Sequence, residues 1–261
     1  MQINLDQLAE LGYTVVPDFM DTKLTARVRE HIDSLTPPIQ PADDPDAGRV
    51  HILRHPIPGA IMAELLSPKL LEAAKIVLHA NELRLLEQVL IRTDPKPPPH
   101  GAGGWHVDWA FLPRHYEARP RQTYYHMVQA LNTVPPNGGA FMIVPGSHHQ
   151  TYATAAKTTT PEELEALHHD PIGVAGIDTS QAIEVRPNDG DLLIFNPMCL
   201  HSASGNASTQ SRYVYFASFF DVSAKEFWQM FRDENSFNER NNYPDSLREA
   251  LPKEFVPLLE F

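Results

Sequence analysis

Cysteine is almost absent from this sequence, which has one, Cys199, among its 261 residues. An internal disulfide framework is therefore excluded, and a reducing, cytoplasmic compartment is expected. No apolar run approaches the roughly 18 residues of a membrane span, and the first residues lack the basic and apolar regions of a secretory signal. Basic residues number 21 against 33 acidic ones, and the net charge of −12 argues against nucleic acid and anionic membranes as partners.

Several catalytic signatures are missing as well. The chain has no phosphate-binding loop, no G-x-S-x-G nucleophile elbow and no C-x-x-C pair. It also has no internal repeat and no linker that would separate two domains. Its length suits one large domain, so we expect a single domain over residues 1–261. A small molecule is the partner that remains, and the oligomeric state is left open.

Helical spacing marks the first part of the chain, and strand patterns follow it. Apolar residues recur at helical spacing in 5–11, 22–35 and 68–80. At least seven short strands follow, among them 83–93, 124–134, 140–144, 183–186, 191–195 and 211–220, and residues 187–190 are interpreted as a hairpin turn. Strands and helices do not alternate, so a two-sheet β-barrel with flanking helices is predicted. The expected parts are a helical region of about 1–82, a β core of about 83–221 and a helical tail of about 222–261.

The segment Thr36–Gly48 contains four prolines and three aspartates. Proline fixes the backbone and removes a hydrogen-bond donor, so this composition excludes regular structure. Two interpretations stay open, a disordered surface loop and a mobile cover over a site.

The stretch GGWHVDW at 103–109 carries the pattern on which the functional interpretation depends. In a strand, side chains two residues apart share a face, so His106 and Asp108 project together. An imidazole beside a carboxylate can bind a divalent metal, and His201 is the candidate third ligand. The three would form the facial triad that holds non-haem Fe(II) in oxygenases. With thirteen histidines in the chain, an H-x-D tripeptide also arises by chance.

Arg212 follows His201 by eleven residues, at the start of a long apolar strand. A strand, a turn and an antiparallel return can bring two such residues close together. The guanidinium suits bidentate capture of a carboxylate, which predicts a dicarboxylate held between the metal and Arg212. The alternative is that Arg212 is a surface residue at a strand end.

Four motifs resemble those of the phytanoyl-CoA dioxygenase family, whose members depend on Fe(II) and 2-oxoglutarate. They are LGYTVVP at 11–17, WHVDW at 105–109, NGGA at 137–140 followed by VPGSH at 144–148, and GD at 190–191 continuing through His201 and Asn206 to Arg212. They occur in the family's order and cover residues 5 to about 221, which leaves only the last 40 or so uncovered.

The resemblance implies a double-stranded β-helix, or jelly roll, with flanking helices. It implies that His106, Asp108 and His201 hold Fe(II), and that Arg212 binds the distal carboxylate of 2-oxoglutarate. Gln88 matches a position that often lines the cosubstrate pocket, with a surface glutamine on a strand as the alternative. Many relatives carry serine two residues after the distal histidine. This chain has alanine there, at 203, flanked by Ser202 and Ser204, so Ser204 is included among the expected cosubstrate contacts.

The implied reaction is hydroxylation of a C–H bond in a small metabolite, with O₂ consumed and succinate and CO₂ formed. Asp108 is informative because related halogenases replace this carboxylate with a small residue to admit halide. Desaturation, ring closure or epimerisation by the same machinery, and a non-catalytic binding protein, are the alternatives. Aromatic residues near the motif are candidates for the substrate pocket, although core packing explains most of them equally well: Trp109, Phe111 and Tyr125 first, then Tyr124, His126 and Trp228.

Two further groups have other expected roles. His148 and His149 are interpreted as loop residues that bind no metal, and His168 and His169 as complements to a helix dipole. Cys199 lies two residues before His201. It could border the site, but a buried, inert thiol is the preferred interpretation.

Overall fold

The computed structural model describes residues 1–41, 43–54, 59–96, 103–108, 124–223, 243 and 245–260. The strands in these ranges are β1 (Tyr13–Val16), β2 (Val50–Leu53), β3 (Leu83–Thr93), β4 (Gly103–His106), β5 (Tyr124–Ala130), β6 (Phe141–Ile143), β7 (Ile183–Val185), β8 (Leu192–Phe195), β9 (His201–Ala203) and β10 (Arg212–Asp221). The α-helices are α1 (Leu5–Leu11), α2 (Thr22–Leu35), α3 (Gly59–Leu65), α4 (Pro68–Leu78), α5 (Ser147–Ala155), α6 (Pro161–His169), α7 (Pro171–Ala175) and α10 (Asp245–Ala250), with 3₁₀ turns η2 (Thr179–Gln181) and η3 (Lys253–Leu259).

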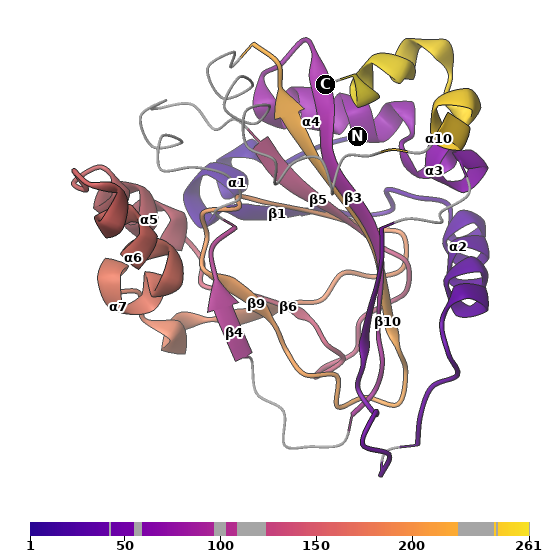
Figure 1. The fold of residues 1–261 in the computed structure, drawn as a ribbon, viewed down its shortest axis with the longest axis horizontal. Helices are drawn as coiled ribbons and strands as arrows, with labels where there is room; N and C mark the ends of the chain where they lie inside the picture. Colours follow the sequence, from indigo (N-terminus) through magenta and orange to yellow (C-terminus); the bar gives the residue numbers. More distant parts are fainter. Residues whose placement is uncertain are drawn as a thin grey trace.

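The strands form two antiparallel sheets (Figure 1). The larger sheet has six strands in the order β1-β8-β5-β10-β3-β2, and the smaller has four in the order β4-β9-β6-β7. This arrangement with its flanking helices is the predicted jelly-roll class, mainly β with helices around it. Strands β1 and β2 come from the first 82 residues, so the helical region also contributes to the larger sheet.

The larger sheet is covered on both faces. On one face, buried residues such as Met127 and Tyr215 pack in a cluster with apolar residues of α2, α3, α4, α10 and η3. On the other face, Val128 and Val214 pack with Ile143 of the smaller sheet. All residues of β5 are therefore buried, which is expected for a central strand covered on both sides.

Helix ends follow the sequence signals closely. The Asp21 side chain accepts a hydrogen bond from Lys23 N at 2.9 Å at the start of α2, and Ser67 caps α4. Thr160 and Glu163 form the reciprocal capping box of α6. Gly12, with φ of 78°, ends α1 in the left-handed conformation that glycine adopts without strain.

The expected hairpin around residues 187–190 is wrong. Strand β7 pairs with β6 in the smaller sheet, whereas β8 pairs with β1 and β5 in the larger one. The connection crosses between the sheets. There, Asp191 accepts hydrogen bonds from the backbone N of Asn188 at 2.8 Å and of Asp18 at 3.0 Å, which fixes the crossing rather than a two-strand turn.

Two shorter elements also differ from the expectation. His148 and His149 lie in α5 and not in a loop, and β5 ends at Ala130 instead of Val134. Helix α5 was hidden because a Pro-Gly pair precedes it and its burial depends on tertiary contacts, with Ser147, His148 and Thr151 all buried. No regular helix or strand forms in the described part of 36–48, as its composition predicts.

Helices α5, α6 and α7 are inserted between β6 and β7 and cluster at one end of the fold, beside β4 (Figure 1). Buried Val107 and Leu200 pack there with Ile172 and Ala175 of α7. Val107 is fixed in this apolar cluster, and its neighbours, His106 at the end of β4 and Asp108 just after it, point to the other side. None of the helices in the described ranges is long and apolar enough to cross a membrane.

Candidate metal and cosubstrate site

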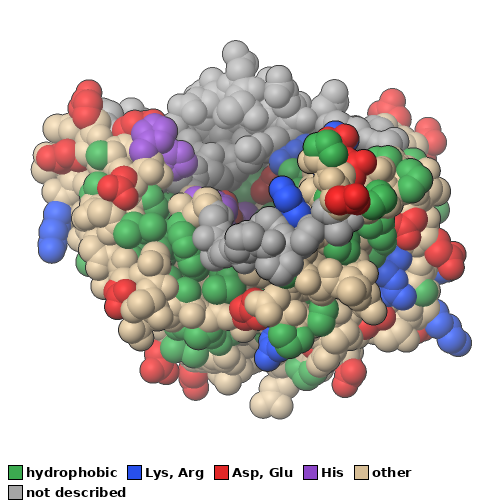
Figure 2. Space-filling view, turned by 90° about the horizontal axis from the view of Figure 1, so that it is seen from below, with side chains coloured by type: hydrophobic (Ala, Val, Ile, Leu, Met, Phe, Trp, Pro, Cys, Tyr) green, Lys and Arg blue, Asp and Glu red, His purple; other side chains and the backbone are tan. Residues whose placement is uncertain are grey.

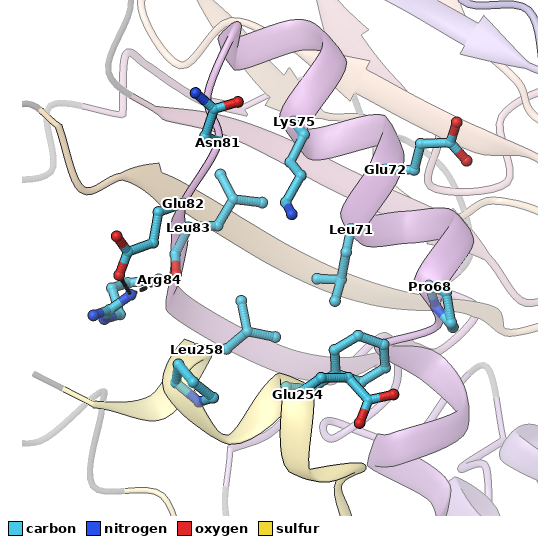
Figure 3. Close-up of a pocket in the computed structure, with 12 residues that line it drawn as sticks. Pro68, Leu71, Glu72, Lys75, Asn81, Glu82, Leu83, Arg84, Glu254 and Leu258 are labelled. Atoms are coloured by element: carbon cyan, nitrogen blue, oxygen red, sulfur yellow. Dashed lines mark hydrogen bonds and ion pairs between the residues drawn. The ribbon is translucent and has the colours of Figure 1, made fainter.

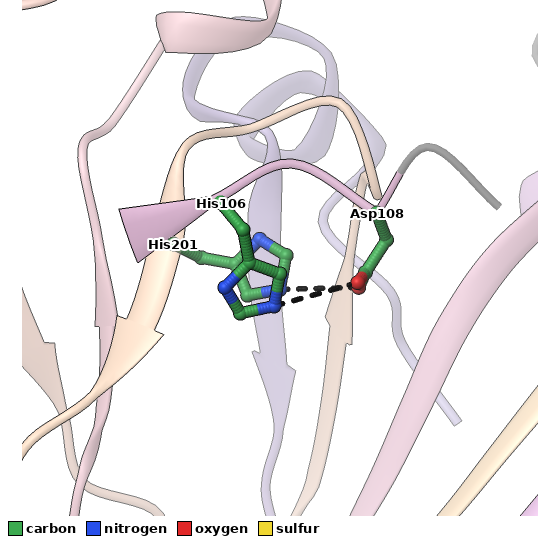
Figure 4. A group of neighbouring side chains, drawn as sticks. All are labelled: His106, Asp108 and His201. Atoms are coloured by element: carbon green, nitrogen blue, oxygen red, sulfur yellow. Dashed lines mark ion pairs between the residues drawn. The ribbon is translucent and has the colours of Figure 1, made fainter. Parts of the chain in front are cut away.

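Strands β4 and β9 place the predicted ligands together. His106 and His201 are register partners across the two strands, and their ring centroids are 4.3 Å apart. The Asp108 backbone N donates to Pro197 O at 2.8 Å, which holds the carboxylate beside both rings. One potential ligand atom from each of the three residues lies within 4.8 Å of the others (Figure 4).

Backbone carbonyls orient the two imidazoles. His106 Nδ1 lies 2.7 Å from Gly104 O, and His201 Nδ1 lies 2.9 Å from Cys199 O. A carbonyl oxygen only accepts, so each Nδ1 carries a hydrogen, and Nε2 is the nitrogen that can bind a metal when the ring is neutral. These Nε2 atoms lie 3.5 Å from Asp108 Oδ1 and 3.1 Å from Asp108 Oδ2, respectively. The arrangement is the one in which metal-bound histidines are usually held.

The electrostatics suit a cation. Burial alone would raise the pKa of Asp108, but the imidazoles of His201, His126 and His106 hold that pKa well below its usual range. The hydrogen bond to Asp108 raises the pKa of His106, against a smaller opposing effect of burial. An ionised carboxylate with two imidazole nitrogens is the donor set of the Fe(II) facial triad, which leaves coordination positions open. The residues present therefore fit the metal.

Arg212 begins β10 in the larger sheet and lacks the partner that a guanidinium usually has. It donates to Gly139 O and, at 3.2 Å, to Thr93 Oγ1, while its Nε has no hydrogen-bond partner among the described residues. No described acidic side chain forms an ion pair with it. Burial lowers the pKa of Arg212 to about 10. A desolvated cation without an anion is costly, so this side chain fits a carboxylate ligand.

Ser204 lies in the same turn region. Its N donates to Ala140 O at 2.9 Å, and its Oγ is buried with no partner in the described part of the chain. Ala203 shares the face of His201 and is exposed, so no hydroxyl stands there. A contact of the Ser204 hydroxyl with the cosubstrate carboxylate stays a prediction.

Two of the expected residues, Gln88 and Tyr125, do not lie on the side of the larger sheet that carries Arg212. Gln88 pairs with Ala217, and Tyr125 pairs with Phe219, on the larger sheet's helix-covered face. That face is opposite to the one that carries Arg212. Burial raises the pKa of Tyr125 to about 12, as expected for a phenol in an apolar layer. The predicted substrate residues Trp109, Phe111 and Trp228 lie outside the described residues.

His126 of β5 was expected only among the pocket-lining aromatics, but the structure gives it a different position. Its ring is 2% exposed, and its Nε2 lies 2.9 Å from Asp108 Oδ2. Tyr124, two residues earlier on the same face, donates its hydroxyl to Asp108 O. The sequence signal that could have found it is a histidine two residues after Tyr124, on the same face of a mostly apolar strand.

The remaining candidates behave as structural groups. Cys199 is fully buried, and burial raises the pKa of its thiol to about 12, which agrees with an inert role. Its Sγ lies 3.3 Å from His148 Nδ1. His169, in the last turn of α6, contacts Glu165 at 2.8 Å on the surface.

The face seen in Figure 2 is hollowed near its centre, and histidine and acidic side chains are visible inside the hollow. A second concavity is a groove of about 480 Å³ between α4, the start of β3 and η3 (Figure 3). None of the three triad residues lines it. Its lining mixes apolar residues such as Leu71 and Leu258 with charged ones such as Lys75 and Glu82. It holds none of the residues described above.

Comparison with known proteins gives a family and a fold. Residues 8–214 match the family described as phytanoyl-CoA dioxygenase. No curated protein sequence matches the chain. Among solved structures, HygX from Streptomyces hygroscopicus, with nickel, 2-oxoglutarate and hygromycin B bound, has a TM-score of 0.55 at 18% identity, covering 84% of this chain and 86% of its own.

Two further structures are similar. EvdO2 from Micromonospora carbonacea var. aurantiaca, complexed with 2-oxoglutarate, has a TM-score of 0.58 at 19% identity, with 83% of this chain and 89% of its own covered. SnoN, an α-ketoglutarate-dependent epimerase from nogalamycin biosynthesis, has a TM-score of 0.55 at 19% identity, with 83% and 81% covered. At these identities the likeness concerns the fold.

Proposed function

The chain belongs to the phytanoyl-CoA dioxygenase family, and on that premise we propose that it hydroxylates a C–H bond of a small-molecule metabolite. It is a non-haem Fe(II)- and 2-oxoglutarate-dependent dioxygenase, with O₂ as the oxidant and succinate and CO₂ as co-products. The hydroxylation outcome and the class of substrate are the parts that we propose.

The proposed roles follow from the site. His106, Asp108 and His201 would hold Fe(II) through two Nε2 atoms and one carboxylate oxygen, and Arg212 with Ser204 would bind the distal carboxylate of 2-oxoglutarate. When bound, the metal couples decarboxylation of the keto acid to activation of O₂ and to removal of hydrogen from the substrate. Arg212 orients the cosubstrate, because its planar guanidinium donates to both carboxylate oxygens in one orientation.

One observation carries the proposal: the chain has both a preoriented His-Asp-His group and a partly buried guanidinium, Arg212, that has no ion-pair partner among the described residues. A pure binding module would have no need of either feature. Asp108 also occupies the position that halogenases leave to halide, which favours hydroxylation over halogenation.

A second outcome, epimerisation, is favoured by the similarity to SnoN. Desaturation and ring closure belong to the same set, since all differ only in the fate of the substrate after hydrogen is removed. HygX binds hygromycin B, and SnoN acts in nogalamycin biosynthesis, which supports a small natural-product or metabolite substrate for this chain. We place the enzyme in the cytoplasm, because one cysteine in 261 residues suits a reducing compartment.

The test has two stages. Fe(II)-loaded protein is first screened for compounds that stimulate succinate formation from 2-oxoglutarate, with Asp108→Ala as the inactive variant and Asp178→Ala, a surface aspartate, as the matched control. The product is then made under ¹⁸O₂. One labelled oxygen supports hydroxylation, whereas loss of two hydrogens without label shows desaturation or ring closure. An inverted centre with no change in mass shows epimerisation, and no succinate with a broad panel contradicts the proposed activity.

A further inference from the structure

The larger sheet contributes a third histidine to the metal site, and it contacts the carboxylate rather than the metal position. His126 Nε2 lies 2.9 Å from Asp108 Oδ2 as an ion-pair contact, and it forms no hydrogen bond of good geometry within the described part of the chain. The group whose ligand atoms lie within 4.8 Å of one another contains His106, Asp108 and His201, and does not include His126. His126 therefore contacts the carboxylate but lies outside this group of three.

Ser218 contacts the other ring nitrogen of His126. The two residues are direct register partners on β5 and β10, and Ser218 Oγ lies 2.5 Å from His126 Nδ1. Both side chains are buried, at 0% exposure for Ser218 and 2% for His126. A neutral imidazole satisfies both contacts only when Nδ1 accepts from the serine hydroxyl and Nε2–H donates to the carboxylate. The carboxylate only accepts and so sets this tautomer, and the Ser218 hydroxyl, which can donate or accept, matches it by donating to Nδ1.

Packing fixes the direction of the ring. The His126 ring centroid lies 4.9 Å from that of Phe195 and 4.7 Å from that of Phe216, so the imidazole has aromatic neighbours on two strands. Tyr124, on the same face of β5, holds the Asp108 carbonyl. Strand β5 of the larger sheet thus restrains both the main chain and the side chain of Asp108, which follows β4 of the smaller sheet.

We propose that His126, supported at Nδ1 by Ser218, is the positioning residue for the Asp108 carboxylate. This inference rests on the proposed function, since it assigns Asp108 to the metal. A ligating carboxylate that is hydrogen-bonded through one oxygen keeps the other directed at the ion, and loss of such a partner typically lowers metal affinity 10- to 100-fold.

Cobalt(II) is the probe, because it needs no anaerobic handling and its visible absorption reports coordination. Each variant is titrated with Co(II), and the dissociation constant is measured beside the melting temperature of the metal-free protein. His126→Leu is expected to weaken Co(II) binding 10- to 100-fold. His126→Gln, whose amide can donate to Asp108 and accept from Ser218, is expected to recover most of the affinity. Ser218→Ala should weaken binding by a smaller factor, because the hydrogen bond that supports the ring at Nδ1 is lost.

Gln129→Leu provides the matched control. Gln129 is on the same strand, is 1% exposed and bonds Leu65 O at 3.1 Å, but it lies on the opposite face of the sheet. Its loss should lower the melting temperature and leave the Co(II) affinity of the folded protein unchanged. If His126→Leu and Ser218→Ala both bind Co(II) as tightly as the parent, or if Gln129→Leu weakens binding equally, the positioning role is refuted.

Asp108→Ala separates this inference from the proposed function. If the parent binds Co(II) and Asp108→Ala binds it equally well, the metal site itself is misassigned, and the role of His126 fails with it. If Asp108→Ala loses binding while the His126 variants do not, the site stands and the inference about His126 alone is overturned.

Discussion

Replacing Arg212 with methionine tests the cosubstrate site, because binding and stability should respond differently. Methionine removes the hydrogen bonds to Gly139 O and Thr93 Oγ1, which together contribute about 1–3 kcal/mol. The substitution also removes a buried charge. Burial lowers the pKa of Arg212 to about 10, and this shift destabilises the folded protein by up to about 3 kcal/mol, or less because the side chain is partly exposed. The two changes offset each other. We therefore expect the free energy of unfolding of the cosubstrate-free protein, measured in urea, to change by no more than about 1 kcal/mol.

The affinity for 2-oxoglutarate should fall much further. Charge-assisted hydrogen bonds to a carboxylate contribute about 1.5–3 kcal/mol, which is a factor of about 10 to 150 in the dissociation constant. The assay is an anaerobic titration of the Fe(II) protein followed by the absorption of the metal–keto-acid complex, with Arg212→Lys as an intermediate that keeps the charge and loses the fork. Unchanged affinity for Arg212→Met would refute the assignment. Destabilisation by more than about 3 kcal/mol would show that Arg212 is chiefly structural.

Three other predictions concern stability and the proline-rich segment. Burial lowers the pKa of His148 to about 4, so the unfolded chain binds a proton that the folded one does not between about pH 6.5 and 4. Stability should therefore fall by up to about 3 kcal/mol as pH falls through that window, and His148→Gln should show a shallower slope in urea unfolding across it; equal slopes would exclude His148 as the source. Gly12→Ala would place a Cβ 2.0 Å from Cys199 Sγ at a φ of 78°, so we expect it to lose about 2–5 kcal/mol of stability, and a loss under 1 kcal/mol in the same assay would contradict the packing. Arg92 donates to Pro37 O at 2.6 Å and pairs with Asp94, so Arg92→Met should speed proteolysis within Thr36–Gly48, whereas an unchanged cleavage rate would mean that other contacts hold the segment. A lid role for this segment stays a prediction, and deletion of residues 38–47 without effect on turnover would leave only a surface loop.

The sequence allowed the metal group to be predicted because its geometry is local. His106 and Asp108 share a face through strand periodicity, and Val107 between them is buried as the alternation requires. The bounds of β3 and the starts of α2 and α4 were also predictable, since capping residues and apolar spacing act over a few residues. His201 was a candidate from its place after a strand, and the resemblance supported that choice, because its pairing with His106 spans 95 positions of sequence.

The sequence did not show which residues of β3 and β5 face the cavity and which face the helices. Strands β3 and β5 are buried on both faces, so alternation gives no sign of the cavity side, and Gln88 and Tyr125 were expected on the wrong face relative to Arg212. An irregularity between Ser218 and Phe219 further shifts the register along β10. The strands on either side of residues 187–190 looked like a hairpin because a turn signal is local, while membership of a sheet is a long-range property.

Asp108 links the two sheets, and this connects the chemistry to the fold. Its backbone N bonds to Pro197 O ahead of β9 in the smaller sheet, while its carbonyl and carboxylate contact Tyr124 and His126 of the larger one. Arg212, which would hold the other end of the cosubstrate, belongs to the larger sheet, whereas both histidine ligands belong to the smaller. A change in the spacing of the sheets would therefore alter the distance between metal and cosubstrate anchor unless Asp108 moved with both. The contacts from both sides restrain it, so the packing of the barrel sets the geometry in which the keto acid must bind.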